Sequence, residues 1–118
     1  MSKYANPGEL RTPVFFVRIE RTTDPEGYTT DSEINVFGEG VPVMTKWVNA
    51  HGTDAFAAMT LSLREPATVT CRWSPRIRPD CLIYKAGDTD PYEIISLDNV
   101  EERNTWLEIK VQRKVAAR

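Results

Sequence analysis

Apolar and polar residues alternate along most of the chain, with the period of two that is typical of a β-strand with one buried face. In residues 13–21 the alternation places Phe15, Val17 and Ile19 on one face, which we expect to be the buried one. The same pattern predicts further strands over residues 28–37, 41–48, 68–73, 81–86, 92–97 and 106–112. Short strands with turn residues between them favour a small barrel or sandwich.

Two stretches interrupt this alternation. Gly38-Glu39-Gly40 predicts a bulge or sharp bend, at which a strand leaves one sheet edge and joins another. Residues 49–65 instead predict one short helix, because Thr53 is a suitable N-cap and Phe56 and Met59 recur at helical spacing. We therefore expect a mainly β fold: a small antiparallel β-barrel of about six to seven strands, with one short helical insertion between the second and third main strands.

The chain has 118 residues, which is enough for one hydrophobic core and too few for two. We expect a single domain with an N-terminal arm at residues 1–12, the helical insertion at 49–65 and a frayed tail at 113–118. Every apolar run is shorter than the roughly 18–20 residues of a membrane span, and residues 1–7 lack the apolar stretch of a secretion signal. These features predict a soluble protein made inside the cell.

The charge balance is close to neutral. Fifteen Lys and Arg residues stand against seventeen Asp and Glu residues, giving a formal net charge of -2. This balance disfavours a dedicated duplex-DNA binder, which would carry a clustered basic surface. A local group of four arginines has three interpretations: a solvated loop with partial ion pairing, a protein–protein interface, or a contact with nucleic acid. Its members are Arg64, Arg72, Arg76 and Arg78.

The residue pattern offers no arrangement for catalysis. Cys71 and Cys81 form no CxxC pair and His51 is the only histidine, so a Cys/His zinc site cannot be assembled. We expect both thiols to be reduced, and we interpret His51 as a surface residue at a turn. The sequence also lacks a nucleophile elbow and a phosphate-binding glycine loop. We therefore expect a protein that is not an enzyme and that has no cofactor or metal.

Three stretches together carry a resemblance to a known family. Asn6-Pro7-Gly8-Glu9-Leu10-Arg11 opens the chain directly before the first strand, and residues 47–59 contain a W-x-x-A…G-x-D-x-F-x-A block. Residues 67–114 run through a strand, an arginine with an aromatic residue, P-x-I-x-P-D, a hairpin ending in Y-E-I, an aspartate and a final alternating strand. In this order and spacing the chain resembles the head–tail joining proteins of tailed bacteriophages, also called head-closure or stopper proteins.

This resemblance implies a structural virion protein, made in the cytoplasm of the host bacterium and located at the head–tail interface. It implies a ring of identical copies, typically dodecameric, that closes the DNA channel after packaging and provides the tail attachment surface. The implied partners are the portal or adaptor ring of the capsid connector, the tail terminator or tail tube proteins, and the packaged double-stranded DNA in the lumen; no membrane is involved. The alternative is an OB-like module that binds single-stranded nucleic acid, as small barrels often do.

Two groups of residues are the candidate sites. The insertion matches the family's loop that projects into the channel as a gate, although an amphipathic helix packed on the barrel mouth would explain the same pattern. The predicted gate residues are Ala50, Gly52, Asp54, Phe56, Ala58, Met59 and Ser62. The predicted contacts with neighbouring copies or the connector are Asn6, Pro7, Glu9, Arg11, Arg76 and Arg78.

Overall fold

The computed structural model describes residues 7–49 and 65–114, which form strands and two three-residue 3-10 helices. The strands are β1 (Thr12–Thr23), β2 (Thr29–Asn35), β3 (Val43–Asn49), β4 (Ala67–Arg72), β5 (Leu82–Lys85), β6 (Tyr92–Asn99) and β7 (Trp106–Arg113). The short helices are η1 (Pro7–Glu9) and η2 (Val100–Glu102). Within this described part of the chain, no helix has the length and apolar character needed to cross a bilayer.

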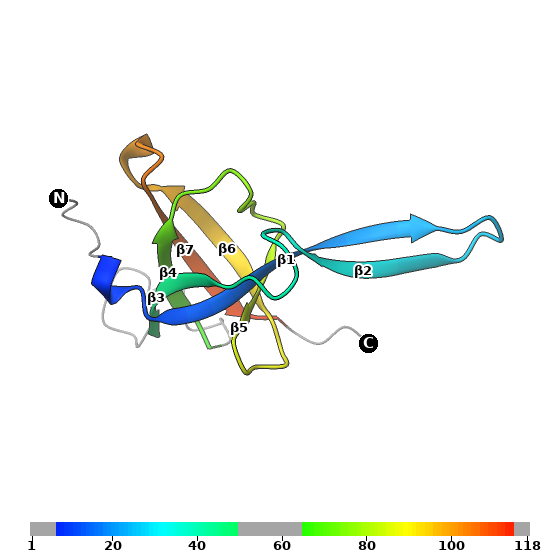
Figure 1. Cartoon of the computed structure of the whole chain (residues 1–118), viewed down its shortest axis with the longest axis horizontal. Coiled ribbons are helices and arrows are strands. Elements are labelled where there is room, and N and C mark those ends of the chain that lie inside the picture. Colours follow the sequence, from blue (N-terminus) through cyan, green and yellow to red (C-terminus); the bar gives the residue numbers. More distant parts are fainter. Residues whose placement is uncertain (1–6, 50–64, 115–118) are drawn as a thin grey trace.

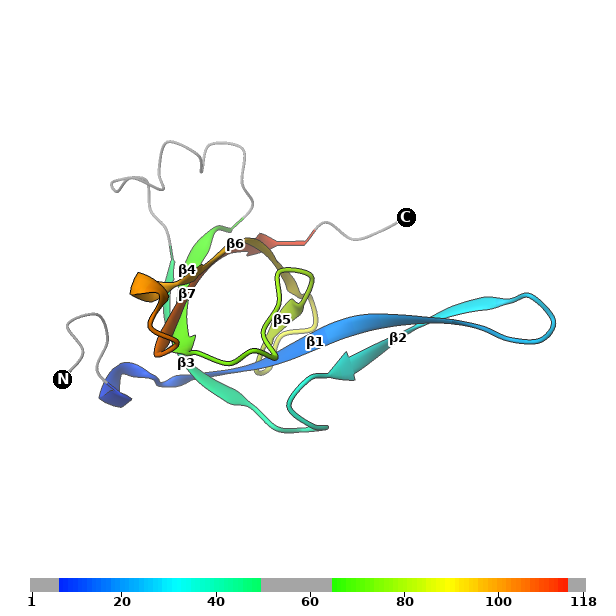
Figure 2. The same cartoon turned by 90° about the horizontal axis from the view of Figure 1, so that it is seen from above.

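A closed antiparallel barrel is the centre of the fold. Its strand order is β1-β3-β4-β7-β6-β5, and β5 returns to pair with β1, so that the strands form a circle when viewed from above (Figure 2). The circle closes because β1 has two neighbours: its residues 12–14 pair with β3 and its residues 14–17 pair with β5. Closure protects the backbone groups that an open sheet would leave unpaired at its edges.

The strand β2 lies outside this barrel. It pairs with residues 17–23 of β1, which continue beyond the barrel wall. We call residues 18–34 the hairpin arm; it projects from the barrel and sets the long dimension of the molecule, 54 Å against 32 and 27 Å (Figure 1). At its tip, Asp24 Oδ1 accepts hydrogen bonds from the backbone N–H groups of Glu26 and Tyr28, which is the chemistry of an aspartate-initiated turn.

Apolar side chains from the barrel strands fill the interior. The largest fully buried ones are Phe16, Ile83, Leu107 and Ile109. Thr45 is buried among them, and its hydroxyl donates a 2.9 Å hydrogen bond to the carbonyl of Thr12, which satisfies the polar group inside the core. The barrel is therefore a packed core and not an internal channel.

The predicted core-facing side of β1 is wrong. Val14 and Phe16 point into the core and are fully buried, whereas Phe15, Val17 and Ile19 belong to the opposite side. On that side Val17 is still buried, at 7% exposure, while Phe15 is partly buried and Ile19 is 42% exposed in the arm. The physical reason is that this part of β1 is apolar on both faces. One face meets the barrel interior, and the other lines a groove beside β2 and the turn that follows it.

The other predicted strands are confirmed, with ends that differ by two residues or fewer. The break predicted at Gly38-Glu39-Gly40 is also confirmed. Gly38 and Gly40 have φ values of 110° and 74°, which side chains other than glycine rarely adopt. The turn separates β2, which pairs with the outer half of β1, from β3, which pairs with its beginning.

The predicted helical insertion at 49–65 is not supported. The described residues contain no α-helix, and Asn49 is the last residue of β3, because it extends the ladder by pairing with Ala67 of β4. The segment 50–64 lies outside the described residues, and with it lie all seven predicted gate residues, His51 and Arg64. What the structure does describe is the pair of adjacent strands from which this segment leaves and to which it returns.

Candidate assembly surfaces

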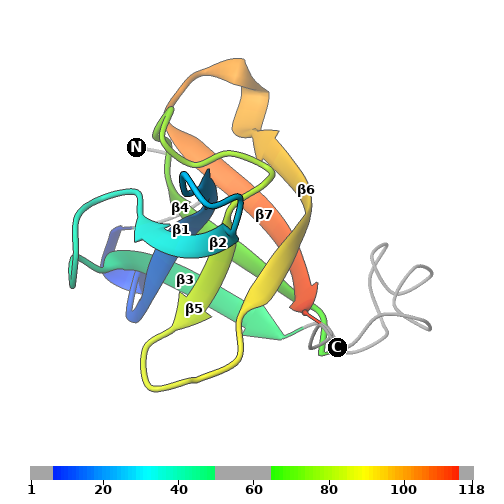
Figure 3. The ribbon, with the colours of Figure 1, turned by 90° about the vertical axis from the view of Figure 1, so that its right-hand side faces the viewer.

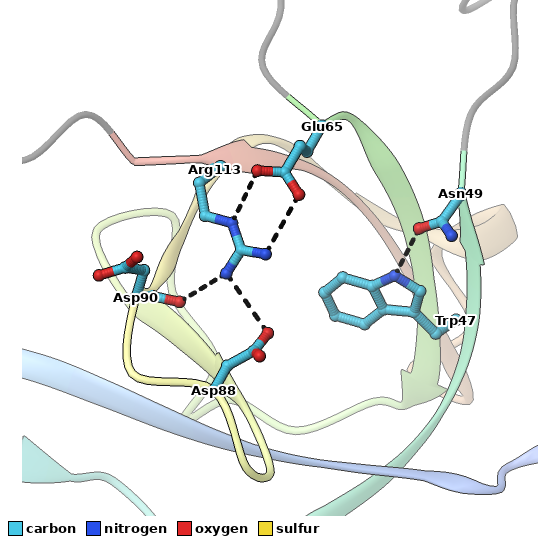
Figure 4. A network of polar contacts seen from close by, with 6 residues as sticks. All are labelled: Trp47, Asn49, Glu65, Asp88, Asp90 and Arg113. Carbon is cyan, nitrogen blue, oxygen red and sulfur yellow. Dashed lines mark hydrogen bonds and ion pairs between the residues drawn. The ribbon is translucent and has the colours of Figure 1, made fainter.

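The hairpin of residues 86–91 lies at one end of the barrel (Figure 3), and charged side chains form a network there (Figure 4). Arg113, the last residue of β7, forms a bidentate ion pair with Glu65, in which the Nε–Oε2 and Nη2–Oε1 distances are both 3.2 Å. Its Nη1 also donates to Asp88 Oδ2 at 3.3 Å and to the carbonyl of Asp90 at 2.9 Å. Arg113 therefore ties the residues before β4 to the hairpin.

The same guanidinium stacks on an aromatic pair. Its Cζ lies 4.2 Å from the ring centroid of Tyr92, and the Tyr92 ring meets Trp47 edge to face at 4.8 Å. Nζ of Lys85 lies 4.8 Å from the centroid of Trp47. Burial raises the pKa of the Tyr92 hydroxyl, and the hydrogen bond with Glu65 raises the pKa of Arg113. An aromatic pair thus lies between two cations at this end of the barrel.

This cluster holds both ends of the segment 50–64. On one side, Nε1 of Trp47 donates a 3.0 Å hydrogen bond to Oδ1 of Asn49, at the end of β3 (Figure 4). On the other side, Glu65 has a φ of 44°, in the left-handed region that costs a residue with a side chain about 1–2 kcal/mol. The bidentate pair with Arg113 offsets part of that strain and fixes where the chain re-enters the barrel.

The predicted N-terminal contact residues lie beside β3. Pro7 and Glu9 belong to η1, and the Glu9 carboxylate pairs with Nζ of Lys46 on β3 at 3.4 Å. Nε of Arg11 donates to the carbonyl of Gly8 at 3.1 Å, which closes the short helix. Asn6 lies outside the described residues. These contacts place η1 against the outside of the barrel.

The predicted arginine contacts lie elsewhere, in the loop between β4 and β5 (Figure 3). Ile77 is only 4% exposed and anchors this loop in the core, while Arg76 and Arg78 on either side of it are exposed. Arg76 stacks over the ring of Phe37 at 5.9 Å. The structure therefore presents the two arginines at a surface, but it does not bring them together with η1.

The four arginines considered together in the sequence do not form one surface. The guanidinium of Arg72 lies 5.6 Å from the centroid of the Trp106 ring, on the outer side of β4 and β7. Arg64 lies outside the described residues. Only Arg76 and Arg78 remain as an exposed basic pair in one loop.

A groove between the barrel and the hairpin arm was not predicted from the sequence. It has a volume of about 730 Å³; Phe15 and Val17 form part of its lining, and Glu33, Glu39 and Tyr84 also line it. The Tyr84 hydroxyl donates a 2.5 Å hydrogen bond to Glu33, which links β5 to the arm. Burial, followed by this carboxylate, raises the pKa of Tyr84 to about 12. The lining residues come from separate segments of the chain, so no local sequence pattern predicts the groove.

Metal-ligating groups and reactive thiols are the remaining features that could form a functional site. Among the residues that the structure describes, no three His, Cys, Asp or Glu side chains are grouped to hold a metal ion. Cys71 and Cys81 are buried free thiols. Burial raises the pKa of Cys71 to about 12 and is the main cause of the raised pKa of Cys81. The prominent features are therefore contact surfaces.

The comparison with known families decides what these surfaces belong to. The family of phage head completion proteins matches residues 5–114, which is nearly the whole chain. The chain belongs to that family. A head completion protein is a structural component of the phage head and not an enzyme, in agreement with the resemblance seen in the sequence. The match gives no support to an OB-like module that binds single-stranded nucleic acid.

Two solved structures share the fold of this head completion protein. The solution structure of protein SF1141 from Shigella flexneri 2a superposes with a TM-score of 0.70 at 16% identity, covering 96% of this chain and 100% of that one. A chain from the virion of a native gene transfer agent particle superposes with a TM-score of 0.57 at 14% identity, covering 90% and 98%. At such identities the likeness concerns the fold alone. No curated protein sequence matches the chain.

Proposed function

We propose that this head completion protein forms a ring of identical copies, dodecameric in the particle, between the portal or adaptor ring of the capsid and the tail terminator or tail tube proteins. The ring closes the DNA channel after packaging and provides the surface to which the tail attaches. The observation that carries the proposal is the family match over residues 5–114. The near-neutral chain supports it, because a strongly basic lumen would hold DNA and hinder its passage.

In this proposal the segment 50–64 acts as the gate. Its sequence supports the role, since small residues let several copies crowd around one axis and Phe56 and Met59 supply apolar contacts between them. The described ends of the segment support it as well. A gate needs rigid attachment points, and the contacts of Asn49 with Trp47 and of Glu65 with Arg113 provide them.

The contact surfaces of the ring follow from the same proposal. Residues of η1 on the outside of β3 would meet one neighbour or the connector, and Arg76 and Arg78 would meet another. These groups occupy separate surfaces of the barrel, which suits a head-to-tail ring, where each copy uses two different patches. Arginine is enriched in such interfaces.

The proposal is tested by deleting residues 52–62 and joining the ends with a short Gly-Ser linker, which leaves Asn49 and Glu65 in place. DNA-filled heads that lack this protein are supplied with the purified wild-type or deleted chain. Nuclease protection then measures the retained DNA, and negative-stain microscopy reveals whether a ring is present below the connector. Glu102→Ala, an exposed substitution in η2, serves as the matched control.

We expect the deleted chain to fold and to form rings, while the amount of protected DNA falls at least tenfold compared with wild type and Glu102→Ala. Full protection by the deleted chain would contradict the gate. An unfolded product would instead show that the segment packs on the barrel mouth. If the wild-type chain forms no ring at the connector, the proposed function itself is wrong.

A further inference from the structure

Beyond Glu33 and Ile34, which meet the barrel at the groove, the hairpin arm lacks packing partners for its faces among the described residues. All of its side chains are exposed except Glu20 and Ile34, which are partly buried. A two-stranded ribbon is at best marginally stable by itself in water, so an arm that extends from the barrel gains from a surface that covers it. The arm is also acidic, with five carboxylates against two arginines, Arg18 and Arg21.

The tip of the arm has the residues of a protein–protein contact: an exposed aromatic side chain with charged neighbours. Tyr28 is 71% exposed, the largest exposed fraction among the exposed large apolar side chains of the described part. Asp24 and Glu26 stand next to it in the turn. Tyrosine is among the residues that carry most of the binding energy at protein interfaces, typically where its ring is buried and charged groups surround it.

A matching surface lies on the outer side of β3. Met44 and Val48 are 43% and 49% exposed and point away from the core, with Lys46 between them. The neighbouring strands β4 and β7 add Arg72 and Lys110 to this outer wall. The wall therefore offers an apolar pair among three basic and two acidic side chains, since Glu9 of η1 pairs with Lys46 and Glu108 pairs with Lys110.

The two surfaces lie on different sides of the barrel, so one copy cannot bring them together. Figure 2 shows β3 and β4 on the side of the barrel away from the arm. Two unlike patches that fit each other produce a head-to-tail interface, and such an interface generates a ring when its rotation closes. The tip is acidic, whereas the wall has one excess positive charge, with Arg72 outside the two ion pairs, and this difference favours the pairing over contact between two acidic arms.

We propose that the tip of the hairpin arm of one copy, with Tyr28 as its anchor, docks on the outer face of β3 in the next copy, between Met44 and Val48. The occupant of the β3 wall is thus a second copy of this chain. The inference rests on the proposed ring and specifies its contact. It also gives a role to Tyr28, Met44 and Val48, three of the exposed large apolar side chains of the described part.

Cross-linking in assembled particles tests this contact. The double variant Glu26→Cys/Thr68→Cys places the cysteines beside Tyr28 and Val48 and keeps both of these residues. This variant and the two single variants are assembled on heads and treated with a short bismaleimide. Cys71 and Cys81 are buried, and the wild-type chain controls for their reactivity. The matched control is Glu26→Cys/Thr89→Cys, in which the second cysteine sits in the exposed hairpin at 86–91. Thermal unfolding of each variant checks that these substitutions leave the fold intact.

We expect the double variant to give a ladder of covalent oligomers, because each copy is linked to the next around the ring. A mixture of the two single variants should stop at dimers, since each chain then carries one reactive partner. The Thr89 control should give at least tenfold less product. Rings without a ladder, or an equal ladder from the control, would overturn this contact and leave the ring standing. Absence of rings would overturn both.

Discussion

Replacing Arg113 by alanine is the most direct test of how the barrel end is held together. The change removes a side chain that is 18% exposed and that contacts Glu65, Asp88, the carbonyl of Asp90 and the ring of Tyr92. These partners lie on different segments of the chain. The substitution should therefore loosen the hairpin at 86–91 and the start of β4 together.

The expected loss can be estimated from the individual contacts. Glu65 is 65% exposed and Asp88 is 39% exposed, so solvent screening reduces each ion pair to about 0.5 kcal/mol. The hydrogen bond to the Asp90 carbonyl contributes about 1 kcal/mol, and stacking on Tyr92 contributes about 0.5 kcal/mol. The free energy of unfolding should fall by about 2.5 kcal/mol in total.

Urea unfolding followed by tryptophan fluorescence measures this loss. A change of this size should lower the midpoint by about 1 M urea. Arg18→Ala is the matched control, because Arg18 also forms an ion pair, with Glu20 at 3.1 Å, but both side chains are about half exposed. Its free energy of unfolding should change by less than about 0.5 kcal/mol. Arg113→Lys should fall between the two, since lysine keeps the charge but not the bidentate geometry.

A special role for Arg113 would be refuted if Arg113→Ala and Arg18→Ala lowered the free energy of unfolding by the same small amount. In that case the contacts of Arg113 in Figure 4 would together stabilise the fold no more than an ordinary surface ion pair does. It would then not hold the re-entry point of the segment 50–64. An equal loss in Arg113→Lys and Arg113→Ala would instead show that the fork of hydrogen bonds, and not the charge, is the stabilising element.

Three further predictions concern the thiols, alkaline pH and the arginine loop. Because burial raises the pKa of Cys71 to about 12 from 9.0, its thiolate fraction at pH 8 falls about a thousandfold, so maleimides should label Cys71 and Cys81 only after urea unfolds the protein. The pKa of Tyr84 is about 12 in the folded state and 10.0 when unfolded, so the unfolded chain loses its proton first and stability should fall as pH rises from 10 to 12. Urea unfolding at pH 9 and 11 should show a smaller fall for Tyr84→Phe, and an equal fall would contradict the assignment. The double variant Arg76→Glu/Arg78→Glu should stay folded by circular dichroism but bind connector-bearing heads at least tenfold more weakly in co-sedimentation; unchanged binding would exclude the loop from the contact.

The strands could be predicted from the sequence because a barrel wall has one buried and one exposed face. In β7 the alternation of Leu107, Ile109 and Val111 with charged residues gives both the strand and its buried side. In β1 the same rule gave the strand but the wrong side, because Phe15 and Phe16 make both faces apolar. Period alone cannot distinguish a face that meets the core from one that lines an outer groove.

The hairpin arm and the Arg113 network were harder to predict for different reasons. Residues 29–33 read Thr-Thr-Asp-Ser-Glu, and this lack of apolar side chains was the available sign that β2 leaves the barrel. Arg113 fell in the segment expected to fray, and its partner Glu65 is 48 positions away in the chain. Contacts of this kind depend on which strands become neighbours, and strand order is a property of the closed barrel that local sequence does not encode.

The closed barrel separates the residues that stabilise this head completion protein from those available for contact. The buried apolar cluster lies within the barrel and its connecting loops, and the arm adds no side chain to it. Substitutions at Tyr28 or Val48 should therefore alter assembly at nearly constant stability. Arg113 is different, because it joins the core-facing ring of Tyr92 to the solvent-exposed Glu65. A change there should alter stability and DNA retention together, and that coupling distinguishes the residues that hold the segment 50–64 from those that only meet a neighbour.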